Sequence, residues 1–113
     1  MNQTDNTTSN RQERMAQLIK ELSASFLARE NNRTSLITVT NCNISPDLKK
    51  STIFITVLPE SKETFALEFA KRRRKDLRIF LKKNMQTKII PFVDIVIDLG
   101  EKNRQKIDEL LRN

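Results

Sequence analysis

The residues best suited to chemistry in this sequence are the bases between Lys71 and Lys88. This segment holds nine basic residues and one acidic residue, Asp76, for a net charge of +8. Lysine and arginine neutralise phosphates, and arginine adds a planar fork that binds a phosphate through two hydrogen bonds. The segment therefore predicts contacts with a polyanion from Lys71, Arg72, Arg73, Arg74, Lys75, Arg78, Lys82, Lys83 and Lys88.

The rest of the chain does not share this excess of positive charge. All 113 residues together carry 21 bases and 14 acids, so the residues outside the segment are close to neutral. Exposed helices usually interleave the two signs, whereas successive like charges repel one another. A surface that serves only solubility is the alternative interpretation, but five consecutive bases in a near-neutral background favour a polyanionic partner.

The composition argues against an enzyme. The chain has no His, no Trp, no Tyr, one Gly and one Cys, Cys42. No side chain therefore has an ordinary pKa near neutrality, and one glycine cannot build a phosphate-binding loop. Asp94 and Asp98 share a strand face but lie roughly 13 Å apart, too far for a joint metal site or a glycosidase-type acid pair. Cys42 is expected to be a small buried hydrophobe. We expect no catalysis, cofactor, metal or small-molecule substrate.

Sequence features also predict the compartment of the protein. A single cysteine forms no internal disulfide, which fits a reducing compartment. The first ten residues lack the basic and apolar regions of a signal peptide, and no apolar run approaches the ~20 residues of a membrane span. We expect a cytoplasmic, monomeric, single-domain protein.

Hydrophobic spacing predicts an α+β domain in the order αββααβα. Residues 1–9 form a polar tail, expected to be disordered, ahead of a domain over 10–113. A helix capped by Ser9 or Asn10 runs to Arg29, and its apolar stripe is Met15, Leu18, Ile19, Leu22 and Phe26. Strands over residues 36–44 and 51–58 form an antiparallel hairpin, and the buried face of the second strand is Ile53, Ile55 and Val57.

The bases themselves fall on a long helical pattern. Pro59 ends the second strand, Ser61 caps the helix, and an uninterrupted helix would reach Lys83. Arg73 then falls within the apolar face, so we predict a bend near residues 72–76 and leave Arg73 with a structural or a binding role. The bend would place the bases on an exposed elbow, while the apolar face is directed to the core through Phe65, Phe69, Leu77 and Leu81.

A third strand and a short helix complete the predicted fold. The strand begins near Thr87, and its alternation directs Val93, Ile95, Ile97 and Leu99 to the core. Gly100 breaks the strand, and an amphipathic helix with Ile107, Leu110 and Leu111 follows. Most Phe residues fall on predicted core faces, with Phe54 and Phe92 the least clearly assigned. Recognition of folded RNA by shape and backbone therefore fits better than base stacking.

Several patterns resemble bacterial ribosome-binding factor A over roughly residues 10 to 112. The first is Arg11-x-x-Arg14-Met15-Ala16-x-x-Ile19-Lys20-Glu21-Leu22. The hairpin adds Ile44-Ser45-x-Asp47-Leu48-Lys49 and Ile53-Phe54-Ile55-Thr56-Val57-Leu58. The last is Leu77-Arg78-x-x-Leu81-x-x-x-Met85-x-x-Lys88-Ile89-Ile90-Pro91, followed by Phe92 through Asp98.

The resemblance implies a type II KH-like fold, with helices on one face of a three-stranded sheet. It also implies a cytoplasmic, non-catalytic role in late maturation of the 30S subunit and 16S rRNA processing, associated with growth in the cold. In the family an Ala-x-Gly kink breaks the long helix, whereas the matching positions here hold Arg73, Arg74 and Lys75. We therefore expect the basic elbow to contact 16S rRNA, with Arg11, Arg14 and Lys88 flanking it.

Two other functions fit a basic segment. A basic amphipathic helix would bind an anionic membrane or an acidic protein partner, provided that its apolar face is free. A duplex-DNA reader is the other, but the chain has no helix-turn-helix pattern.

Overall fold

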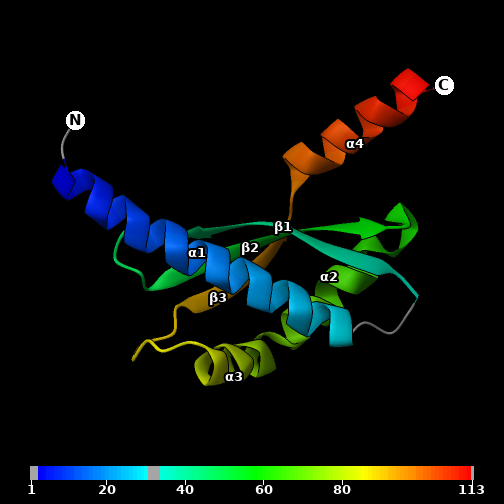
Figure 1. Ribbon diagram of the computed structural model, residues 1–113. Coiled ribbons are helices and arrows are strands. Elements are labelled where there is room, and N and C mark those ends of the chain that lie inside the picture. The colour runs from blue at the N-terminus through cyan, green and yellow to red at the C-terminus, as the bar shows by residue number, and fades with distance from the viewer. Residues whose placement is uncertain (1–2, 31–33, 113) are drawn as a thin grey trace.

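The computed structural model describes residues 3–30 and 34–112. Three helices pack against a three-stranded sheet, and a fourth helix extends away from it (Figure 1). This confirms the α+β class and the predicted element order. The elements are α1 (Gln3–Glu30), β1 (Leu36–Ile44), β2 (Lys50–Leu58), the 3-10 helix η1 (Glu60–Lys62), α2 (Glu63–Arg72), α3 (Arg74–Asn84), β3 (Phe92–Ile97) and α4 (Leu99–Arg112).

The sheet has the strand order β1-β2-β3, with β2 in the middle. β1 pairs with β2 in antiparallel register, Cys42 opposite Ile53, as the predicted hairpin requires. β3 pairs with β2 in parallel register, with Ile95 opposite Ile53. Parallel strands need a crossover connection, and α2 and α3 supply it. The crossover therefore contains the whole basic segment, and α2 and α3 both contact β3.

One core joins the sheet to the three helices. Ile53, Ile55 and Val57 are buried, which confirms the predicted face of β2. The helices contribute fully buried side chains from α1 and α3, and β3 contributes Val93 and Ile95. Cys42 is buried as predicted, and this burial raises the pKa of its thiol to about 11. The principal helical members of the core are Ile19, Phe26, Leu27, Ala66, Ala70, Leu77 and Leu81.

The first helix differs from its prediction at the N-terminus. α1 begins at Gln3, so Ser9 and Asn10 lie inside it and the predicted cap is wrong. Each added residue of an existing helix gains one backbone hydrogen bond, so residues of modest propensity can extend it. The boundary of the folded domain at residue 10 stays a prediction. On the core side, the predicted stripe member Leu18 is exposed, whereas Leu27 is buried.

The start of the second helix was also predicted wrongly. Ser61 lies within η1, and the residue before α2 is Lys62, which makes no capping hydrogen bond through its side chain. Pro59 ends β2 as predicted, and its carbonyl accepts a hydrogen bond from the Lys62 amide at 2.9 Å. That bond closes the 3-10 turn. α2 then buries Ala66 and Ala70, so Phe65 is turned out of the core, against the prediction.

The third strand begins at Phe92 and not near Thr87. Pro91 comes directly before it and is buried, and it donates no ladder hydrogen bond. The strand ends at Ile97 because Asp98 turns the chain into α4: its carboxylate accepts a hydrogen bond from the Glu101 amide at 3.0 Å. Leu99 and Gly100 therefore lie in α4, so their predicted places in the core and at a strand break are wrong.

The C-terminal helix meets the domain through its polar side. The ammonium of Lys102 lies 3.2 Å from the Glu60 carboxylate and 3.0 Å from that of Glu63. No residue of α4 is buried. The amphipathic helix is thus confirmed, but its apolar side chains Ile107, Leu110 and Leu111 face solvent.

Candidate nucleic-acid interface

The predicted bend lies at Arg73. Its φ of −92° and ψ of 5° interrupt the helical geometry between α2 and α3. Its amide donates to the carbonyls of Phe69 and Ala70 at 3.2 and 3.1 Å, which closes α2. Its carbonyl accepts a hydrogen bond from the Leu77 amide at 2.9 Å, which opens α3. A negative φ is open to any residue, so the helix breaks here without the glycine of the family kink.

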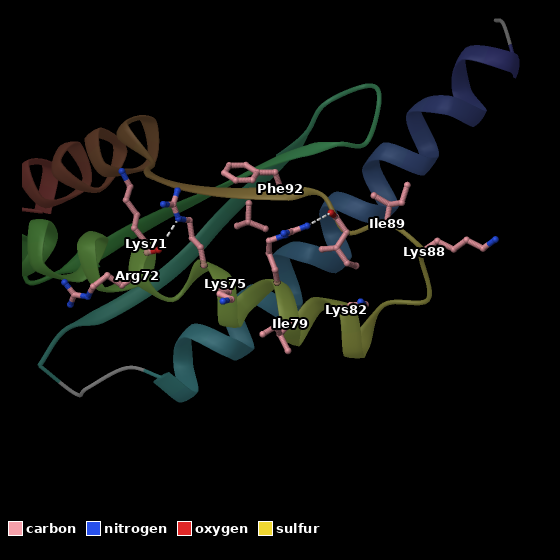
Figure 2. Close-up of a pocket in the computed structure, with 12 residues that line it drawn as sticks. Lys71, Arg72, Lys75, Ile79, Lys82, Lys88, Ile89 and Phe92 are labelled. Carbon is pink, nitrogen blue, oxygen red and sulfur yellow. Dashed lines mark hydrogen bonds between the residues drawn. The ribbon is translucent and has the colours of Figure 1, made fainter.

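A groove of about 730 Å³ lies between the broken helix and β3. Figure 2 shows Arg72 and Lys88 at its opposite ends, with Lys75, Ile79 and Lys82 along α3. We call it the basic groove. It is lined by Lys71, Arg72, Arg74, Lys75, Arg78, Ile79, Lys82, Lys88, Ile89, Ile90, Phe92 and Val93.

The structure therefore brings most of the predicted bases to one place. Seven of the nine bases of the segment line the basic groove, and none of the lining residues is acidic. Charge of one sign along a concave surface concentrates the electrostatic potential and attracts anions. Because the groove is open along its length, it suits a chain of phosphates better than a small enclosed anion.

Four of the predicted site residues do not line the groove. Arg73 lies 3.1 Å from the Asp76 carboxylate, which assigns it to the helix break. Lys83 is exposed on α3 outside the groove lining. Arg11 and Arg14 are exposed on α1, and neither lines the groove.

Two arginines of the groove are held in place by the protein. Arg78 donates a hydrogen bond to the carbonyl of Ile90 at 3.1 Å, so α3 is joined to the segment before β3. Arg74 donates to the carbonyl of Lys71 at 3.1 Å and lies 3.4 Å from the Asp94 carboxylate. These contacts hold both guanidinium groups before any ligand arrives, which lowers the entropy lost on binding.

The lining of the groove includes exposed apolar side chains as well as bases. Ile79, Ile89 and Phe92 are exposed there, and Phe92 retains 57% of its accessible surface. Phe65 was predicted to face the core, and that prediction is wrong. Phe92 was not clearly assigned, and its exposure agrees with the predicted alternation of the strand. Alternation along the strand was the available signal for Phe92, since its neighbour Val93 faces the core. The approach of the loop before β3 to α3, in contrast, has no local sequence signal.

Alternative chemistries find little support in the described residues. Over 3–30 and 34–112, no three His, Cys, Asp or Glu residues are grouped as a metal site would require. Asp94 contacts Arg74, whereas Asp98 accepts hydrogen bonds from Thr40 and from the Glu101 amide. The two carboxylates thus belong to different contacts. Among the helices described, none is long and apolar enough to cross a membrane.

These features define a class of protein. A three-stranded sheet and a broken helix between its parallel strands are the features of a type II KH-like domain, and here a basic groove lies beside the break. The sequence model of ribosome-binding factor A matches residues 11–111. The chain belongs to the ribosome-binding factor A family.

Individual proteins agree with this assignment. Ribosome-binding factor A of Methylobacterium sp. (strain 4-46) is 32% identical over 110 residues, which cover 93% of this chain and 79% of that one. The crystal structure of ribosome-binding factor A from Thermus thermophilus is similar with a TM-score of 0.66 at 21% identity, covering 76% of this chain and 94% of that one.

A third similar structure is a homology model of Thermus thermophilus ribosome-binding factor A, fitted into the cryo-EM map of a 30S complex with that protein. Its TM-score is 0.61 at 22% identity, with 71% of this chain and 87% of that one covered. These structural similarities confirm the KH-like fold.

Proposed function

We propose that this protein binds the small (30S) ribosomal subunit and acts in its late maturation, through contacts between the basic groove and 16S rRNA. The observation that carries the proposal is the set of seven bases lining one groove with no acidic residue among the lining. Membership of the ribosome-binding factor A family supports the ribosome as the partner. A homology model of the Thermus thermophilus relative has been fitted into the map of a 30S complex. We propose a cytoplasmic monomer without catalytic activity, with a role in 16S rRNA processing and growth in the cold.

Contacts with the phosphates of the RNA backbone would provide most of the binding affinity. Each phosphate neutralised by a lysine or arginine releases condensed counterions, so affinity should fall steeply with salt. Arg74 and Arg78 are already oriented by Asp94 and by the Ile90 carbonyl, whereas Lys75 and Lys82 lie along α3 without a partner in the described contacts. The groove thus combines two guanidinium groups that the protein orients with the point charges of lysine side chains.

The principal alternative is an anionic membrane or an acidic protein bound by the same helices. Insertion would need the apolar face of α3, yet Leu77 and Leu81 are fully buried in the core. The burial of this face favours the RNA proposal.

Co-sedimentation with purified small subunits tests the proposal. The variant replaces Arg72, Arg74, Lys75 and Arg78 with Ala, and a control of equal charge replaces Lys49, Lys50, Lys106 and Arg112, which lie outside the groove. We expect the groove variant to lose at least about tenfold in affinity and the control to bind nearly as well as the wild type. Immature subunits should retain more protein than mature ones.

Two results would oppose the proposal. If the groove variant co-sediments with subunits as fully as the wild type and has an unchanged melting temperature, the basic groove does not form the binding interface. Stronger binding to anionic vesicles than to subunits would favour the membrane alternative. Thermal unfolding of both variants is needed because Arg74 and Arg78 also join α3 to neighbouring segments.

A further inference from the structure

A second, smaller pocket shares Arg72 with the basic groove. It has a volume of about 200 Å³ and lies between the start of β1 and one side of α2. Arg72 lines both the pocket and the groove, and Figure 2 shows it at the groove end remote from Lys88. One arginine therefore belongs to the lining of both cavities. We call the smaller one the α2 pocket.

An exposed aromatic ring forms one wall of the α2 pocket. Phe65 retains 71% of its accessible surface, although it sits in a helix that buries Ala66 and Ala70. Phe69, one turn further along α2, lines the same pocket and is partly buried. An aromatic face open to solvent offers a flat surface on which a nucleobase of any sequence can stack.

Positive charge flanks this aromatic wall. Lys62 precedes α2 and Arg72 ends it, and both are exposed residues of the pocket lining. The lining contains no carboxylate. Glu63, which is next to Lys62 in sequence, lies 3.0 Å from the ammonium of Lys102 on α4 and is thereby engaged elsewhere. A phosphate on either side of a stacked base would meet a cation of the pocket lining.

Polar groups complete the rim at the start of β1. Thr34 and Ser35 line the pocket opposite the aromatic wall. An aromatic face between two cations matches the recognition elements of a nucleotide in a single strand.

We propose that the α2 pocket holds one unpaired nucleotide of an RNA strand whose backbone continues into the basic groove. The base stacks on Phe65, and its phosphates lie between Lys62 and Arg72. This inference rests on the proposed function, because it extends the same RNA path across Arg72. It adds a base-stacking contact to a surface for which backbone recognition alone is predicted from the sequence.

Binding of a short RNA to the full chain tests the stacking contact. The probe is a fluorescein-labelled single-stranded RNA of about twelve nucleotides, long enough to span both cavities. Phe65→Ala should weaken binding about tenfold, the effect expected for loss of one base–aromatic stack. The matched control is Leu111→Ala, which truncates a similarly exposed side chain on α4 and should leave affinity unchanged.

A spectroscopic variant reports on the pocket directly. The chain contains no Trp and no Tyr, so Phe65→Trp introduces a single indole at the proposed stacking face. Unlabelled RNA of the same length should quench its fluorescence at the concentrations that produce binding. A Glu-rich peptide of similar length and charge should not quench it.

The outcomes separate the two proposals. If Phe65→Ala binds RNA with unchanged affinity while the groove variant loses binding, the proposed nucleotide site in the α2 pocket is wrong. The proposed function would then still hold. Unchanged affinity of both variants would overturn both. Quenching of the indole by the peptide as strongly as by RNA would assign the pocket to an acidic protein segment and overturn the RNA proposal. Because Phe65 is exposed, its variants should fold, which their melting temperatures will check.

Discussion

Arg74 and Asp94 join the helix that lines the basic groove to the strand that closes it. Their side chains approach to 3.4 Å and retain 39% and 47% of their accessible surface. The Oδ1 atom of Asp94 also accepts a hydrogen bond from the amide of Ile95 at 2.9 Å. An exposed pair of this kind adds at most about 1 kcal/mol to stability. Its larger effect is to set a negative charge beside seven positive ones.

Replacing Asp94 with Asn should therefore strengthen RNA binding. The amide keeps an acceptor for the Ile95 amide but removes the charge that attracts Arg74. We expect an increase in affinity of about threefold at low salt and a change in unfolding free energy below about 1 kcal/mol. Fluorescence anisotropy and urea unfolding measure the two effects. Asp108→Asn, in an ion pair on α4, is the control. Weaker binding by Asp94→Asn would mean that the orientation Asp94 gives to Arg74 contributes more to affinity than the removal of its negative charge.

The helix break at Arg73 should tolerate alanine better than glycine. Its φ is −92°, so glycine brings no conformational relief and adds freedom to the unfolded chain. We expect Arg73→Ala to be more stable than Arg73→Gly by about 1 kcal/mol in urea unfolding. Both variants lose the contact with Asp76, so the difference between their unfolding free energies reports only the conformational preference of the backbone at residue 73. A more stable glycine variant would show that the break is strained.

The contact between Thr40 and Asp98 should make stability depend on pH. The Thr40 hydroxyl donates to Asp98 at 2.5 Å, and this bond, followed by that from the Glu101 amide, lowers the pKa of Asp98. A lowered folded-state pKa stabilises the protein at neutral pH, and that contribution is lost as the pH falls through the lowered value. Thr40→Val should cost about 1 kcal/mol near neutrality.

The cost of Thr40→Val should shrink in acid, because a protonated Asp98 is a weaker acceptor. Urea unfolding at a series of pH values measures it. Thr38→Val, at an exposed position of the same strand, serves as the control and should show no such dependence. If Thr40→Val lowers the unfolding free energy equally at every pH, the Thr40 hydrogen bond is not what lowers the pKa of Asp98.

Cys42 should react slowly with thiol reagents in the folded protein. Burial raises its pKa to about 11, so the thiolate fraction at pH 8 is roughly two hundredfold smaller than for an ordinary thiol. Reaction with a disulfide reagent should accelerate at least that much in denaturant. The chain has one Cys, so the readout is unambiguous. Equal rates in the two states would place Cys42 at an accessible site.

Local patterns determined much of this protein in advance. Alternation along the strands predicted the buried face of β2 and the burial of Val93 and Ile95 on β3, because side chains on a strand point to opposite sides in turn. The position of Arg73 on the apolar face predicted the break between α2 and α3. The run of like charges predicted a polyanionic partner, since repulsion along the chain is independent of the fold.

Tertiary structure decided which of those charges lie together. Seven bases line one groove because the crossover sets α3 beside β3, whereas Arg73 turns to Asp76 and Arg11 and Arg14 remain on α1. It also decided that Phe65 is exposed, since the close packing of Ala66 and Ala70 selects which side of α2 is buried. Periodicity identifies an apolar side of a helix, but only the packing partners determine how far that side is rotated toward the core.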